Sequence, residues 1–203
     1  MFVPGQPALL LSRGDRAWRD LVASTGVSQR PVVSLQFIVS SWLRGGNTFD
    51  LDNLIHPVIA AMGSPEQAQT SVWATIEVGD VPGVDIGERV PPPSPPGSVR
   101  FHLADPPRRS VRSNEILAEL GDAQILGEDE PVGCSLVLGA DVSGIVFGFE
   151  GVIKPTIDSL WPVLGGAAHS PSDHRIRDLR VRTDPSIRGL DVALWLSPVE
   201  AAR

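Results

Sequence analysis

This sequence has a single cysteine and no long apolar run. Cys134 is the only cysteine, which excludes intrachain disulfides and thiolate-rich zinc sites and is typical of a packed core thiol. No apolar run approaches the roughly 20 residues that cross a bilayer, and the short run Ala8–Leu11 near the N-terminus has no cleavage site. The sequence therefore predicts a cytoplasmic protein with no membrane partner.

Basic side chains are also scarce. Lys and Arg number 17 against 24 Asp and Glu, and the formal net charge is -7, which argues against non-specific nucleic-acid binding by the whole surface. A local basic face stays open, because arginines gather in two clusters. They are Arg108, Arg109 and Arg112, then Arg175, Arg177, Arg180, Arg182 and Arg188. The other interpretation is that these are solvated arginines that balance nearby aspartates.

Proline gathers near the middle of the chain. The segment Pro91–Gly97 has five prolines, so it cannot form a helix or a central strand, and it is typical of a semi-rigid linker. A chain of 203 residues is long enough for two domains that each bury a core. We therefore expect a first domain over 1–90, a linker over 91–97 and a second domain over 98–203.

The two halves contain an internal repeat. Phe49–Met62 matches Phe147–Leu160, with 147 − 49 = 98 residues between equivalent positions, and the two segments share an aromatic residue, an Ile-x-Pro step and their apolar positions. Shorter matches flank this one in the same order: Pro31–Leu35 with Pro131–Leu136, and Gly83–Asp85 with Gly189–Asp191. Matches in a common order predict a tandem duplication.

Hydrophobic periodicity predicts similar elements in both halves. In the first half we expect helices over 16–23 and 51–62 and strands over 32–40 and 72–78. In the second half we expect strands over 98–103, 133–140 and 175–181 and helices over 114–120 and 151–160. The predicted fold class is α+β, with two units that are each a small mixed β-sheet packed with helices.

Two carboxylates precede the helix predicted over 51–62. If the backbone is extended there, Asp50 and Asp52 point to one face, and the free N–H groups at the start of the helix can hold an acidic side chain. Two converging carboxylates suit Mg²⁺, which can activate water and stabilise a phosphodiester transition state. The alternative is that Asp52 or Asn53 only caps the helix and Asp50 is solvated.

The pattern Asp50-x-Asp52-Asn53, followed by an amphipathic helix, resembles the RusA-type Holliday-junction resolvases. The resemblance covers most of residues 1–80 and includes the opening Val3–Pro7 and the helix over 16–23. Second-half segments that also resemble the family are Val99–Pro107, Ile153–Leu160 and Asp173–Leu179. Family members act as homodimers on four-way DNA junctions, so the resemblance implies a pseudo-dimer within one chain that acts on branched DNA, with further self-association open.

The resemblance also implies roles for individual residues. Asp50, Asp52, Lys154 and Asp173 would be catalytic, and Asp50, Asp52, Glu150 and Asp173 would hold Mg²⁺, with Mn²⁺ as a substitute. Nucleic-acid contacts would come from Asn53, His56, Arg175, Arg177, Arg180 and Arg182.

Neither half carries the whole set of family residues. His56 stands where the family has lysine, and in the second half Gly148 and Glu150 replace the two aspartates. Lys154, the only lysine of the chain, stands at the family's lysine position in the second half. A lone lysine there is consistent with a phosphate contact, and also with a surface helix residue that pairs with Asp158.

Three functional expectations follow from these patterns. The first is a Mg²⁺-dependent, structure-selective endonuclease of the RusA type that cuts branched DNA. The second is a catalytically decayed relative that binds DNA junctions or a protein partner without cleavage, because incomplete ligand sets generally remove such chemistry. The third is an unrelated α+β domain in which the aspartate pattern is a helix cap.

Overall fold

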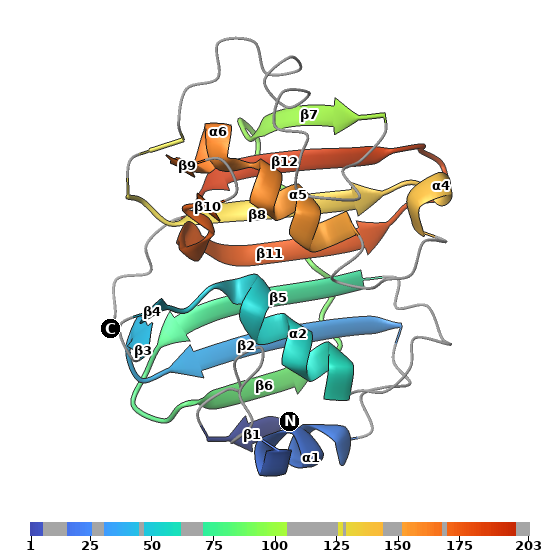
Figure 1. Ribbon diagram of the computed structural model, residues 1–203. Coiled ribbons are helices and arrows are strands. Elements are labelled where there is room, and N and C mark those ends of the chain that lie inside the picture. Colours follow the sequence, from blue (N-terminus) through green and yellow to red (C-terminus); the bar gives the residue numbers. More distant parts are fainter. Residues whose placement is uncertain are drawn as a thin grey trace. The chain divides into compact units, whose positions relative to one another are not determined.

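The computed structural model describes residues 1–5, 16–25, 31–44, 47–61, 71–104, 126–127, 129–143, 152–167 and 170–197. The chain divides into two compact units, which we call unit 1, Met1–Pro91, and unit 2, Pro92–Arg203. Figure 1 shows that β-strands make up most of both units. Each unit is described by itself.

Four strands of unit 1 pair in the order β1-β6-β2-β5. They are β1 (Phe2–Pro4), β2 (Val32–Val39), β5 (Ser71–Val78) and β6 (Gly83–Gly87). Strands β2 and β5 are parallel, whereas β6 is antiparallel to both β2 and β1. The alternating apolar residues of β2 are buried, as is typical of a strand that faces a core on one side.

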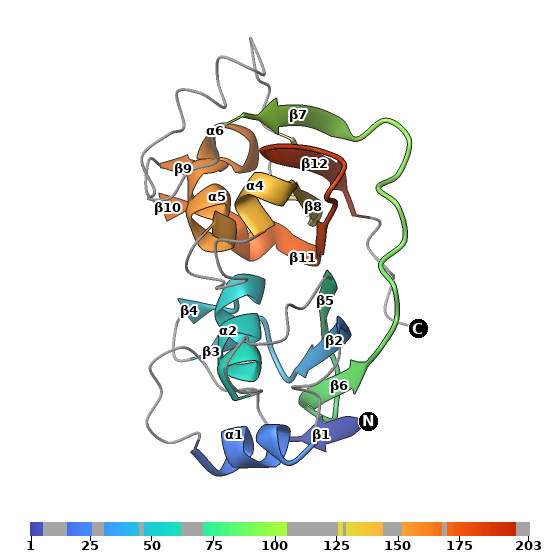
Figure 2. The same ribbon diagram turned by 90° about the vertical axis from the view of Figure 1, so that its right-hand side faces the viewer.

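Two helices cover one face of the unit 1 strands. They are α1 (Arg16–Ala23) and α2 (Leu51–Ala61), which lie on the same side of the ribbon in Figure 2. Helix α2 buries Leu51, Leu54, Ile55 and Val58, which are spaced as on one face of a helix. A small hairpin of β3 (Leu43–Arg44) and β4 (Asn47–Thr48) precedes α2 and leads into Asp50.

Unit 2 also has four long strands, in the order β11-β8-β12-β7. They are β7 (Val99–Leu103), β8 (Val132–Leu138), β11 (Ile176–Thr183) and β12 (Leu190–Leu196). The shorter elements are α4 (Ala140–Ser143), α5 (Lys154–Ser159), α6 (Trp161–Leu164), β9 (Gly166–Ala167), β10 (Ser170–Pro171) and η4 (Asp173–Arg175). Strand β8 is parallel to β11 and antiparallel to β12, and β12 is antiparallel to β7.

The two units share one strand order and one set of strand directions. In both, the first strand pairs with the last, the last pairs antiparallel with the second, and the second pairs parallel with the third. The pairing registers align one buried row across each sheet. The rows are Val3, Val84, Phe37 and Ile76 in unit 1, and Phe101, Val192, Leu136 and Val181 in unit 2. This shared topology supports an internal repeat.

The register also corrects part of the repeat alignment. The sequence match set Gly83–Asp85 against Gly189–Asp191, whereas the rows set Val84 against Val192. The displacement is two residues along the strand. Because side chains alternate with a period of two, such a displacement preserves the inward and outward pattern, so the sequence pattern alone did not detect it.

The predicted fold class is wrong. We expected an α+β fold of two RusA-like units packed with helices as a pseudo-dimer, whereas the described residues are mostly β: eight strands of mixed sheet with a few short helices. Strands β1, β6 and β12 were not predicted. Glycine at both ends of β6 weakens the strand signal, and β12 lacks alternation because both its faces are largely covered.

The helices of unit 2 are shorter than expected for a local reason. The helix predicted over 151–160 is observed as α5, which is followed at once by α6. Each helix has a proline at its first turn, Pro155 in α5 and Pro162 in α6. Proline fits the start of a helix but cannot continue one, so the chain forms two short helices in place of one long one.

The remaining element predictions are confirmed where the structure describes them. Helix α1 and strands β2, β5, β7, β8 and β11 lie within one to two residues of the expected bounds. The helix expected over 114–120 lies outside the described residues. Within the described part of the chain, no helix combines the length and the apolar character that a membrane span requires.

Candidate functional site

The start of helix α2 in unit 1 holds the aspartates that the sequence singled out. The carbonyl oxygen of Asp50 accepts the N–H of Leu54 at 3.2 Å, which makes Asp50 the residue that opens the helix. Its Oδ2 atom accepts a hydrogen bond from Nδ2 of Asn53 at 3.1 Å. Asp50 and Asn53 are therefore brought together by the helix itself.

Asp52 has different surroundings from Asp50. It lies in the first turn of α2 and is only 4% exposed, whereas Asp50 is half-buried. Because α2 begins at Leu51, the backbone is not extended between the two aspartates. The condition under which both would point to one face is therefore not met. His56 lies further along the same helix.

The donors at this helix end have the chemistry that a hard cation requires. Asp50, Asp52 and Asn53 all offer oxygen ligands, and Mg²⁺ binds to one or two carboxylates while keeping several waters. Within the described residues of unit 1 taken by themselves, no group of three or more His, Cys, Asp or Glu side chains converges. The described residues of unit 1 thus offer oxygen ligands of the kind that a hard cation takes, but the helix does not bring the two aspartates to one face.

Lys154 begins the short helix α5 in unit 2. Its Nζ atom lies 3.4 Å from Oδ1 of Asp158, one turn further along, which is the ion pair that the sequence offered as an alternative to a phosphate contact. Both side chains remain partly exposed. Glu150, the other acidic residue expected near this helix, lies outside the described residues.

Asp173 and Arg175 belong to the short helix η4. Asp173 is half-buried, and Arg175 is only 3% exposed. The Arg175 guanidinium donates to the carbonyl oxygens of Glu130 at 3.1 Å, Leu164 at 2.6 Å, and Leu126. Burial lowers the pKa of Arg175, and the nearby carboxylates of Glu130 and Asp129 partly offset this. Arg175 therefore joins three chain segments of unit 2.

Arg180 holds the proline-rich segment against unit 2. Its Nη1 atom donates to the carbonyl oxygens of Pro92 at 2.9 Å and Pro93 at 2.8 Å, and its Nε atom donates to both carboxylate oxygens of Asp178 at 3.1 Å. The guanidinium also stacks on the Trp195 ring, 4.5 Å from its centroid. In Figure 2 the segment runs along the face of unit 2 opposite α5. The segment expected to be a semi-rigid linker therefore also bonds to unit 2 through Arg180.

The other two arginines of strand β11 are less enclosed. Arg177 is half-buried. The Arg182 side chain is 50% exposed and donates to Oδ2 of Asp184 at 3.2 Å. Hydrogen bonds from Ser186, and then from Arg182, hold the pKa of Asp184 below its usual value. Of the residues expected to contact nucleic acid in unit 2, Arg182 is the most exposed.

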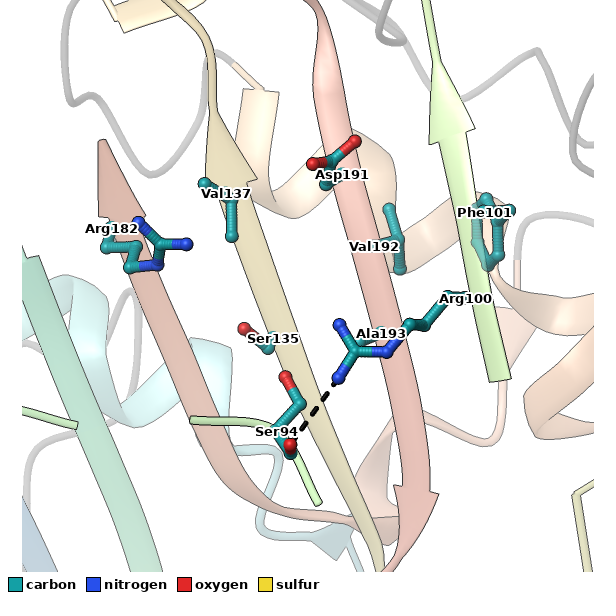
Figure 3. A pocket seen from close by; sticks show the side chains of 9 residues that line it. All are labelled: Ser94, Arg100, Phe101, Ser135, Val137, Arg182, Asp191, Val192 and Ala193. Atoms are coloured by element: carbon teal, nitrogen blue, oxygen red, sulfur yellow. Dashed lines mark hydrogen bonds between the residues drawn. The ribbon is translucent and has the colours of Figure 1, made fainter. Parts of the chain in front are cut away.

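Sequence reasoning missed a pocket on the outer face of unit 2. It has a volume of about 300 Å³, and Figure 3 shows its lining. The lining residues are Ser94, Arg100, Phe101, Ser135, Val137, Arg182, Asp191, Val192 and Ala193. Asp191 also lies 2.7 Å from Nδ1 of His102. The pocket was missed because strand β12 was not predicted. Its outward residues can be identified only once β12 is paired between β7 and β8.

No protein-family model matches the sequence, and no curated protein matches it.

Proposed function

We propose that this protein is a RusA-like, divalent-metal-dependent endonuclease that acts on branched DNA in the cytoplasm. The observation that carries the proposal is the grouping of Asp50, Asp52 and Asn53 at the start of α2, directly after the β3–β4 hairpin. The lone, buried Cys134 suits a reducing compartment.

In this proposal Asp50 and Asp52 hold the cation, Mg²⁺ or Mn²⁺, and the first turn of α2 must rearrange to bring both carboxylates to one face. Such an ion supplies an activated water and charge stabilisation at a phosphodiester. Asn53 orients the Asp50 carboxylate through the 3.1 Å hydrogen bond. The N–H groups of the first turn of α2 favour negative charge at this end of the helix, which suits both the carboxylates and an incoming phosphate.

Unit 2 has a binding role in this proposal. It lacks the first two aspartates of the pattern, since Gly148 and Glu150 stand in their places. Lys154 can exchange its ion pair with Asp158 for a phosphate, because a pair one helical turn apart and partly exposed contributes only a few tenths of a kcal/mol. With one complete pair of aspartates in each chain, paired cuts across a symmetric junction require two chains.

A second candidate is a protein that binds branched DNA, or a protein partner, without cutting. The burial of Asp52 favours it, because an enclosed carboxylate leaves little room for the waters that Mg²⁺ keeps. The use of Arg175 and Arg180 within the fold also favours it, because these guanidiniums bond to unit 2 itself.

Incision of a labelled four-way junction tests the proposal. The protein would be incubated with the junction in Mg²⁺ and separately in Mn²⁺, with linear duplex as competitor. Asp50→Asn and Asp52→Asn should each abolish incision and leave junction binding intact. The matched control is Asp20→Asn, because Asp20 is an exposed aspartate on α1 of the same unit.

The outcomes separate the two candidates. Incision that Asp50→Asn abolishes and Asp20→Asn preserves supports the nuclease. Junction binding that weakens steeply between about 50 and 200 mM salt, without incision, supports the binding protein. Equal incision by the wild type and Asp50→Asn would exclude the proposed site, and absence of both binding and incision would exclude branched DNA.

A further inference from the structure

The outward side chains of the unit 2 sheet lie in rows across its four strands. One row joins Arg100 of β7, Ala193 of β12, Ser135 of β8 and Arg180 of β11, each paired with its neighbour in the sheet register. The two middle residues are small, whereas the two end residues are long arginines. A row of this kind leaves a hollow over its middle, and the pocket of about 300 Å³ lies there.

The walls of this pocket carry positive charge from two sides. Figure 3 shows Arg182 on one side and Arg100 on the other, with Ser135 between them. Ser94, from the proline-rich segment, lines one end, and its carbonyl oxygen accepts a hydrogen bond from Arg100 Nη2 at 3.4 Å. The Ser94 contact fixes the Arg100 head group near the hollow.

Both guanidiniums retain donors for a ligand. A guanidinium has five N–H donors, of which Arg182 directs one nitrogen to Asp184 and Arg100 directs one to Ser94. Asp191 is the carboxylate in the lining, and its Oδ1 lies 2.7 Å from His102. Two arginines against one aspartate leave the pocket lining with a positive formal charge.

We propose that this pocket binds a small phosphate monoester. Guanidiniums bind phosphate and carboxylate better than other groups because their donors form a planar fork. Here they approach from opposite walls, with a serine hydroxyl between them, which suits the several outward oxygens of a tetrahedral phosphate better than the two of a planar carboxylate. The apolar Val137 and Ala193 beside them accommodate a small organic substituent.

The site is independent of the nuclease proposal. It uses no residue of unit 1, and its loss would leave Asp50 and Asp52 unchanged. Unit 1 has different residues at the equivalent register positions of this row. Asp85 stands where Ala193 does, and Gln36 stands where Ser135 does, so longer polar side chains occupy that level of the sheet.

Titration calorimetry on the full chain tests the site. The probes are phenyl phosphate and inorganic phosphate, with acetate as the carboxylate and dimethyl phosphate as the phosphodiester. We expect saturable binding of phenyl phosphate that Arg100→Gln and Arg182→Gln each weaken at least tenfold. Ala193→Leu, which fills the hollow without changing charge, should weaken binding equally. Arg188→Gln is the matched control, because Arg188 is an exposed arginine of unit 2 outside the lining.

Several results would overturn the proposal. They are an absence of saturable binding, an equal loss in Arg188→Gln, and binding of acetate as tight as that of phenyl phosphate. Binding of dimethyl phosphate and junction DNA in preference to phenyl phosphate, lost in the same variants, would also overturn it, because the pocket would then recognise a DNA backbone. Thermal unfolding of each variant identifies any loss of binding that comes from misfolding.

Discussion

The two units share their strand topology but differ in what their polar side chains do. Unit 1 gathers acidic and amide groups at the start of α2, above a sheet whose outer face carries Asp85, Gln36 and Glu77. Unit 2 gathers arginines on the outer face of its sheet, over small residues. The same backbone pairing therefore supports opposite charges at equivalent places.

One equivalent pair makes the difference specific. Strand register sets Glu77 of unit 1 against Arg182 of unit 2, because Glu77 pairs with Ile38 and Arg182 pairs with Val137 at the same level of the sheet. Outward positions accept either charge because they contact solvent, whereas the inward rows stay apolar in both units. The shared topology is thus a property of the core, and the site chemistry is a property of the outer faces and helix ends.

Substitutions in the two buried rows should have the largest effect on the free energy of unfolding. Phe37→Ala should lower the free energy of unfolding by about 3–5 kcal/mol and Leu136→Ala by about 2–5 kcal/mol, because each leaves a cavity in the equivalent row. Urea unfolding monitored by circular dichroism measures both. Val90→Ala, at a 72% exposed position, is the control and should stay within about 0.5 kcal/mol. A small effect in only one unit would break the structural equivalence of the rows.

Buried arginine distinguishes unit 2 from unit 1 among the described residues. Arg175→Met should destabilise the protein by roughly 3 kcal/mol, because it removes hydrogen bonds to three carbonyl groups and leaves the buried carbonyl oxygen of Leu164 without this donor. Chemical denaturation measures the loss, with Arg188→Met as the control. An Arg175→Met protein as stable as the control would show that these bonds contribute nothing net.

Exchange of charge at the equivalent outer positions sharpens the comparison. Arg182→Glu gives unit 2 the charge that Glu77 gives unit 1, and we expect it to reduce phenyl phosphate binding more than Arg182→Gln does. Its unfolding free energy should change by less than about 1 kcal/mol, because the lost Arg182–Asp184 pair is exposed. Calorimetry and urea unfolding measure the two quantities. Strong binding of phenyl phosphate by the Arg182→Glu variant would show that Arg182 does not contribute to ligand binding in the pocket.

Cys134 gives the smallest expected effect. Burial, and then the charge of Asp178, raises the pKa of the Cys134 thiol, so the native thiol stays protonated and should not react with iodoacetamide at pH 8 until the protein unfolds. Above about pH 8.5 the unfolded thiol ionises while the folded one stays protonated, so the free energy of unfolding should fall by a slope that approaches about 1.4 kcal/mol for each pH unit.

The control for this prediction is Cys134→Val. It should abolish the decline in stability above about pH 8.5, which urea unfolding at several pH values would measure. Rapid alkylation of the native protein at pH 8 would show that Cys134 is accessible and would contradict the burial of this strand.

Local patterns predicted most of the described elements but not the fold class. The alternation of β2 and the apolar stripe of α2 identified those elements, because each reports one buried face. Strand β12 has no alternation of apolar and polar residues, because Val192, Ala193, Leu194 and Trp195 are all buried. Its assignment depends on the strands and the arginine that cover it, which lie far from it in the sequence.

The candidate sites divide in the same way. The start of α2 was identifiable from the order of Asp50, Asp52 and Asn53, because a helix cap is formed by residues that are neighbours in the chain. The different burial of the two aspartates was not identifiable, since it depends on packing around the helix. The pocket of unit 2 was not identifiable either, because its lining comes from four strands and the proline-rich segment.

The sequence by itself determined the periodic helices and strands and the helix-opening aspartates, because these depend on residues within one or two turns of each other. It also determined the repeated order of elements, because the two halves can be compared residue by residue. Tertiary structure alone decided that Arg175 and Arg180 bond within unit 2, and that Arg100 and Arg182 line opposite sides of the pocket over Ala193 and Ser135. The physical reason is that strand pairing joins residues far apart in the chain, and its register fixes which side chains share one face of the sheet.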